Sequence, residues 1–204
     1  MTTLLEDIAH YFADHLRRFG TTPAGVGWNA DAQRIRFEQV CKVIADPAGS
    51  VLDFGCGYAA MLDFLRGQRF TGAYRGLDIS PEMIEAAAAR HAGDALASFE
   101  LGSTSSIAAD YVIASGIFNV RYQRDDSEWR AFIDATLAEI NRVAYKGFAF
   151  NCLTSYSDSQ RMREDLFYGD PCYYFDLCKR LYSRQVALLH DYGLYDFTII
   201  VRKQ

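Results

Sequence analysis

The segment Val51–Ala59 (Val-Leu-Asp-Phe-Gly-Cys-Gly-Tyr-Ala) combines a carboxylate with two closely spaced glycines. Its first four residues predict a short buried strand, and a helical run, Ala60–Arg66, follows the glycines. Glycine at such a turn permits positive φ and lets a ligand approach the backbone closely. A dinucleotide fold directs the N-terminus of this helix at an anionic pyrophosphate, which the carboxylate of Asp53 would repel. Asp53 therefore favours a ligand that carries positive charge.

A second carboxylate, Asp78, ends the next predicted strand, Tyr74–Ile79. Strand, glycine turn, helix and strand together make a βαβ unit, which implies parallel pairing and a right-handed crossover. Asp78 lies 23 residues beyond Gly55, and a carboxylate in this place is the usual partner of a ribose diol. Ser80 and Pro81 suit the first positions of a further helix.

Composition limits the classes of protein that this chain can represent. Its 204 residues suit one domain, or one domain with a cap, and a hydrophobic content of 50% is typical of a globular protein. A net charge of −5 argues against a nucleic-acid partner. The sequence shows neither a signal peptide nor an apolar run long enough to span a membrane, so we expect a cytoplasmic protein without a membrane partner. The five cysteines are scattered and contain no CxxC pair, which predicts reduced thiols.

Apolar periodicity predicts the remaining elements along the chain. The expected helices are Leu4–Phe19, one that starts near Asn29 or Asp31, Met83–His91, Ser127–Val143 and Tyr173–Tyr182. The expected strands are Ser98–Leu101, Tyr111–Ala114, Gly147–Asn151, Val186–His190 and Phe197–Arg202. Between the last helix and the strand before it, Cys152–Pro171 is predicted to be a long irregular segment, and loops of that length are often functional.

This arrangement resembles the class I S-adenosylmethionine-dependent methyltransferases. The resemblance is carried by Val51–Gly57, similar to the family's glycine-rich motif, and by Gly76–Met83, similar to its acidic motif. It implies an α/β fold, a Rossmann-like three-layer sandwich with a seven-stranded, mostly parallel sheet and an antiparallel C-terminal strand. Residues 1–30 are expected to form an N-terminal helical cap, and residues 31–204 the methyltransferase domain with a lid-like insertion at 152–175.

The resemblance also implies a donor-binding set for S-adenosylmethionine. Asp53 would hold the ammonium group, the backbone from Gly55 to Gly57 would pass under the ribose and methionine, and Asp78 would accept both ribose hydroxyls. Further expected contacts, around the adenine and the rest of the donor, are Trp28, Cys56, Ile79, Met83, Gly102, Ser103 and Ser115. The family's third glycine is Ala59 here. Alanine is small enough for the helix–strand contact that this position makes.

The acceptor side is less defined. His190, beside Asp191, and His15 are candidate general bases, and each has a packing role as its alternative. Candidate substrate residues are Asn119 and Asn151, which are expected to line the cleft and could orient a substrate, and Tyr156 and Tyr173, which core packing would equally explain.

The favoured hypothesis is metal-independent methyl transfer from S-adenosylmethionine to a small-molecule acceptor, with a hydroxyl oxygen preferred. The sequence lacks the Asn/Asp-Pro-Pro-Tyr/Phe motif of amino methylation after Ala114, and no metal-binding carboxylate stands at Ser115 or Asn151. Two alternatives from other classes stay open, a nicotinamide-dependent oxidoreductase and a non-catalytic cofactor-binding partner subunit. A protein or RNA acceptor is a weaker alternative.

Overall fold

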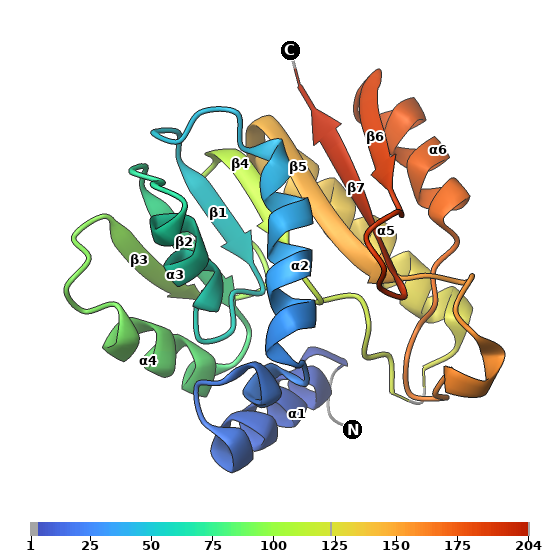
Figure 1. Cartoon of the computed structure of the whole chain (residues 1–204), viewed down its shortest axis with the longest axis horizontal. Helices are drawn as coiled ribbons and strands as arrows, with labels where there is room; N and C mark the ends of the chain where they lie inside the picture. Colours follow the sequence, from blue (N-terminus) through green and yellow to red (C-terminus); the bar gives the residue numbers. More distant parts are fainter. Residues whose placement is uncertain (1–3, 123, 204) are drawn as a thin grey trace.

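The computed structural model describes residues 4–122 and 124–203, and its core is a seven-stranded sheet (Figure 1). The strands lie in the order β3-β2-β1-β4-β5-β7-β6. They are β1 (Val51–Phe54), β2 (Tyr74–Asp78), β3 (Ala97–Leu101), β4 (Ala109–Ala114), β5 (Ala144–Leu153), β6 (Gln185–Leu189) and β7 (Asp196–Arg202). β7 pairs antiparallel with both neighbours, whereas the other neighbouring strands pair in parallel. The predicted fold class is confirmed.

Helices cover both faces of this sheet and make the outer layers of the sandwich. They are α1 (Leu4–Phe19), α2 (Ala30–Val40), α3 (Ala60–Gly67), α4 (Pro81–Arg90), α5 (Asp126–Val143) and α6 (Pro171–Leu181), with short 3-10 turns at Pro23–Val26, Cys41–Val43 and Ser159–Arg161. One buried cluster packs α2, α3 and α4 on the sheet, and a second packs α5 and α6 on the opposite face. None of the helices in the described ranges is long and apolar enough to cross a membrane.

Side-chain caps fix where several helices begin. The Asn29 side chain accepts from the backbone N–H of Ala32 at 2.8 Å at the start of α2. Asp125 accepts from Glu128 at 2.8 Å at the start of α5. Ser80 caps α4, with Pro81 in its first turn, where a missing N–H costs nothing. Of these three caps, that of Ser80 starts its helix directly after a strand, because β2 ends at Asp78.

The C-terminal half departs most from the predicted boundaries. β5 (Ala144–Leu153) extends beyond the predicted Gly147–Asn151 at both ends. Ala144 pairs with Ala109 of β4, and Cys152 and Leu153 pair with Phe197 and Asp196 of β7. α6 begins at Pro171 rather than Tyr173. The prediction that the whole of Cys152–Pro171 is irregular is therefore wrong at both margins.

α1 lies across the edge of the sheet where β1 and β4 end (Figure 1). Its face with Ile8 packs on the cluster that also contains Phe54 and Phe118. Of the predicted cap, residues 1–3 lie outside the described ranges, and the division into cap and domain stays a prediction.

Candidate functional site

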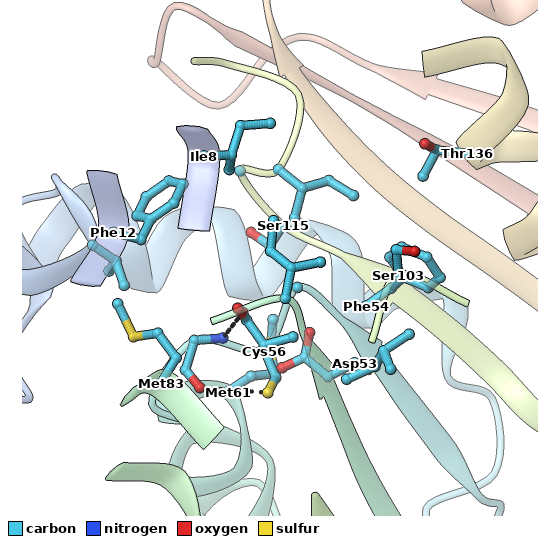
Figure 2. A pocket seen from close by; sticks show the side chains of 18 of the residues that line it. Ile8, Phe12, Asp53, Phe54, Cys56, Met61, Met83, Ser103, Ser115 and Thr136 are labelled. Carbon is cyan, nitrogen blue, oxygen red and sulfur yellow. Dashed lines mark hydrogen bonds between the residues drawn. The ribbon is translucent and has the colours of Figure 1, made fainter. Parts of the chain in front are cut away.

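A cavity of about 330 Å³ lies at the carboxyl ends of β1, β2 and β4, where open α/β sheets bind ligands. Figure 2 shows Ile8 and Phe12 of α1 toward one side of it and Thr136 of α5 toward the other, with Cys56, Asp53 and Ser115 between them. The volume is in the range of small-molecule sites.

The loop Gly55–Ala59 contains the glycines that are predicted to contact the donor, and it is called the donor loop below. All of its residues except Ala59 line the cavity. Gly55 adopts φ +79° and Gly57 φ +55°, a region that favours glycine. A Cβ on Gly55 would lie 2.2 Å from Cγ2 of Ile117, so no side chain fits there. The amides of Gly55 and Cys56 both donate to the carbonyl of Leu77 on β2, at 2.7 and 3.0 Å. The loop is thus fixed by its own backbone and leaves space for a ligand.

Ala59, at the position of the third glycine, is fully buried and has φ +60°. A left-handed conformation costs a residue with a Cβ roughly 1–2 kcal/mol. The position therefore demands an unusual backbone conformation as well as a small side chain.

Asp53 is buried at 3% exposure at the end of β1 and lines the cavity. The hydroxyl of Tyr74 donates to its Oδ2 at 2.5 Å. Burial raises the pKa of Asp53 to about 7, although the Tyr74 hydrogen bond opposes that shift. A cation bound beside Asp53 would favour its ionised form.

Asp78 joins the end of β2 to the donor loop. Its Oδ2 accepts from the amide of Gly57 at 2.8 Å, and its Oδ1 accepts from the amide of Ser80 at 2.9 Å. Burial raises the pKa of Asp78, and these amides oppose the shift. Each carboxylate oxygen keeps acceptor capacity for a further donor, such as a ligand hydroxyl.

Every residue predicted to contact the donor lines this one cavity. These residues are Trp28, Asp53, Gly55, Cys56, Gly57, Asp78, Ile79, Met83, Gly102, Ser103 and Ser115. The cradle of positive-φ glycines and the two carboxylates fit a ligand with a positive charge and a diol. Binding by these residues stays a prediction.

The predicted substrate residues lie outside the lining of the cavity and make other contacts. The Oδ1 of Asn119 accepts from the amide of Leu153, and the Oδ1 of Asn151 accepts from the amide of Gly116. The Tyr173 hydroxyl donates to Asp134. Tyr156 is 69% exposed. Their role in binding a substrate stays a prediction.

The two candidate bases also lie outside the lining of the cavity. His190 is exposed just after β6, with its ring centroid 5.8 Å from that of Tyr156 and 6.5 Å from that of Phe197. The Nδ1 of His15 lies 3.1 Å from the carbonyl oxygen of Tyr11. His15 lines a separate groove beside α1. The assignment of either histidine as a general base therefore stays a prediction.

Two sets of lining residues were not predicted from the sequence. α1 contributes Leu5, Ile8 and Phe12, and α5 contributes Phe132, Ala135, Thr136 and Glu139. The α5 set follows the spacing i, i+3, i+4, i+7, which marks one face of a helix. That spacing was visible, but it is equally the pattern of a core-facing stripe.

Residues 52–143 match a family model described as a methyltransferase domain. The chain is 58% identical over 159 residues to the putative methyltransferase Rv1506c of Mycobacterium tuberculosis. The alignment covers 78% of this chain and 95% of that relative. The identity to this relative, together with the sheet order and the cavity, shows that the chain belongs to the class I S-adenosylmethionine-dependent methyltransferases. Membership confirms the resemblance and excludes the nicotinamide alternative.

Solved structures share this fold at low identity. DhpI in complex with SAH superposes with a TM-score of 0.71 at 17% identity, covering 98% of each chain. Magnesium protoporphyrin IX methyltransferase (ChlM) from Synechocystis PCC 6803, with bound SAM, gives a TM-score of 0.68 at 16% identity, covering 100% of this chain and 99% of that one. Identities this low establish the architecture alone.

Proposed function

We propose that the chain transfers a methyl group from S-adenosylmethionine to a hydroxyl oxygen of a small-molecule acceptor, without a metal ion. The observation that carries this proposal is the joint placement of Asp53, Asp78 and the donor loop around one cavity. The neutral residues Ser115 and Asn151 after β4 and in β5 favour the metal-independent form.

In this proposal the residues at the donor loop hold the cofactor. When bound, S-adenosylmethionine supplies a methyl group on a sulfonium, which is already activated for in-line displacement. Asp53 binds the ammonium group, and Asp78 accepts the ribose hydroxyls while its amide bonds keep the loop in place. Ile79 and Met83 cover the adenine. The chain contributes positioning, which is a large part of the catalysis that such a reaction needs.

The acceptor end of the cavity is assigned to the side of α1. Leu5, Ile8 and Phe12 make that side apolar, which suits a small organic acceptor and excludes water from the reacting atoms. ChlM, which shares the fold, is named for a small-molecule acceptor. The net charge of −5 argues against a nucleic-acid acceptor.

Calorimetric titration with S-adenosylhomocysteine tests the donor site directly. We expect binding by the wild-type protein and a loss of roughly a hundredfold or more for Asp78→Ala, because the variant loses its ligand contacts and the tie to Gly57. Asp63→Ala is the matched control, since Asp63 on α3 pairs with Arg90 at the surface, outside the cavity. Equal binding by the wild-type protein and Asp78→Ala would contradict the assignment.

Methyl transfer to a panel of hydroxylated small molecules, with and without a chelator, tests the acceptor. We expect turnover that the chelator leaves unchanged. Turnover that a chelator abolishes would refute the metal-independent form, and donor binding without turnover on any acceptor would favour a non-catalytic subunit. His190→Gln should keep the wild-type pH profile, because His190 lies outside the cavity.

A further inference from the structure

A buried ion pair lies directly behind the part of the cavity lined by Trp28. The Nε of Arg36, on α2, donates to Oδ1 of Asp196 at 2.9 Å, and Nη2 donates to Oδ2 at 2.6 Å. Their side chains are 12% and 0% exposed. The guanidinium carbon of Arg36 also lies 4.0 Å from the centroid of the Trp28 ring. The pair thus connects β7, the last strand, to a residue that lines the cavity.

The indole of Trp28 is held from a second direction by Gly116, just after β4. A Cβ on Gly116 would lie 2.2 Å from Cζ2 of Trp28, and Gly116 has φ +83°. Its amide donates to the Oδ1 of Asn151 at 2.7 Å, and the Nδ2 of Asn151 donates to the Oγ of Ser115 at 3.2 Å. Trp28, Ser115 and Gly116 all line the cavity, so these contacts fix a continuous part of its wall.

The charge balance of this arrangement matters for a cationic ligand. Asp196 neutralises Arg36 in a region shielded from water, where an uncompensated charge would act strongly on its surroundings. S-adenosylmethionine carries a sulfonium cation, whereas its product is a neutral thioether at the same atom. A bare guanidinium behind Trp28 would therefore repel the donor more than the product.

We propose that the Arg36–Asp196 pair positions Trp28 in the cavity wall and keeps that wall neutral, so that Asp196 controls how well the site accepts the cationic donor. The inference rests on the proposed function, because it takes S-adenosylmethionine as the ligand. Arg36 and Asp196 are positioning residues here: neither is among the residues that line the cavity.

The chain contains a matched pair for comparison. Arg66 donates from Nε to Oδ2 of Asp94 at 2.8 Å, and its guanidinium carbon lies 5.1 Å from the centroid of the Phe70 ring. This second arginine, carboxylate and aromatic ring lie outside the lining of the cavity. Its side chains are 26% and 24% exposed, so disrupting it reports what the loss of an arginine–carboxylate pair does away from the cavity, without leaving a charge in a buried place.

The test is calorimetric titration of the wild-type protein, Asp196→Asn and Asp94→Asn with both S-adenosylmethionine and S-adenosylhomocysteine. For Asp196→Asn we expect the affinity for S-adenosylmethionine to fall about tenfold further than that for S-adenosylhomocysteine, which corresponds to about 1.4 kcal/mol of additional repulsion of the cationic ligand. For Asp94→Asn we expect both affinities to stay within about twofold of the wild type. An equal fall for both ligands in Asp196→Asn overturns the charge-balancing role.

The fluorescence of Trp28 tests positioning without any ligand. The sequence has two tryptophans, and the other, Trp129, is fully buried and donates its N–H to the carbonyl of Phe118. Subtracting the emission of Trp28→Phe from that of each protein isolates Trp28. Arg36→Lys keeps the charge but loses the planar contact and the paired hydrogen bonds, so we expect a red-shifted Trp28 emission and an equal loss of affinity for both ligands.

Arg36→Lys also tests the positioning role if Asp196→Asn does not fold. Unchanged Trp28 emission together with unchanged ligand affinity in Arg36→Lys overturns the positioning role. If the wild-type protein binds neither ligand, the proposed function fails, and the Trp28 emission of Arg36→Lys still reports whether the pair positions the indole.

Discussion

Two regions of the molecule carry residues of chemical interest: the donor loop, and a second region made of residues 118–122, 154–184 and 190–195. Only the donor loop presents such residues to the cavity. Gly55 and Gly57 line the cavity with backbone, and Asp78 stabilises them from β2. In the second region, Tyr156 and His190 pack against each other outside the cavity. Residue type alone therefore does not distinguish a site from its supporting structure.

The difference between the two regions lies in what positions each side chain. The donor loop is determined locally, by a short strand, positive φ and amides that bond to β2. The second region is held by contacts between distant segments, such as the bridge of Val120 with Leu166. A polar side chain there, such as that of Asn119, satisfies a backbone amide rather than a ligand.

The largest expected effect compares glycines of the two regions. Gly55→Val should lower the free energy of unfolding by more than about 3 kcal/mol, for two reasons. Its Cβ would lie 2.2 Å from Ile117, and a residue with a Cβ is strained at φ +79°. Gly193→Ala, between β6 and β7, has φ +73° but no atom within 4 Å of its new Cβ. It should cost only about 1–2 kcal/mol. Urea unfolding of both variants measures this, and similar losses would contradict the distinction.

The next effect concerns Asn151, which supports the cavity wall without lining it. Asn151→Ala leaves the buried amide of Gly116 without its acceptor, which should lower the free energy of unfolding by roughly 1–3 kcal/mol. The matched control is Asn141→Ala on α5, because the buried Oδ1 of Asn141 has no hydrogen-bond partner in the described part of the chain. The control should lose less stability in the same urea titration. The reverse order of the two losses would show that Asn151 does not support the wall in this way.

These contrasts explain how far the sequence predicts the molecule. The βαβ unit, the sheet and the placement of the donor set around one cavity follow from local signals, namely glycines at a turn and a carboxylate at each strand end. The α5 wall, with Thr136 and Glu139, was not predicted because its spacing matches any buried helical face. The roles of Asn119 and Asn151 depend on pairings between β5 and segments far away in the chain, which no local pattern encodes.

The pH dependence of Asp53 distinguishes a ligand-binding carboxylate from a structural one. Burial raises its pKa from 3.8 to about 7, so the ligand-free protein should lose stability as the pH rises from about 4 to 7, since the unfolded chain releases this proton earlier. Asp53→Asn should abolish this contribution. Conversely, the affinity for cationic S-adenosylmethionine should rise between pH 5.5 and 7.5, by at most about tenfold per pH unit. Calorimetric titration of the wild-type protein and Asp53→Asn across this pH range measures the affinity. Parallel pH profiles of the affinity in the two proteins would rule out Asp53 as the titrating group.

The smallest expected effect lies inside the donor loop, at Ala59. Ala59→Gly relieves roughly 1–2 kcal/mol of left-handed strain. Two effects oppose this gain in stability. The loss of a buried methyl group costs about 0.8 kcal/mol, and the greater conformational freedom of the unfolded chain costs about 0.4–1 kcal/mol. The net change in the free energy of unfolding should therefore stay within about 1 kcal/mol. Ala59→Val keeps the strain and adds a branched side chain at a fully buried site, so it should be clearly less stable. If valine were tolerated as well as glycine, backbone conformation would not be what this position selects. Local backbone geometry would then determine the donor loop less strongly than the comparison with the second region implies.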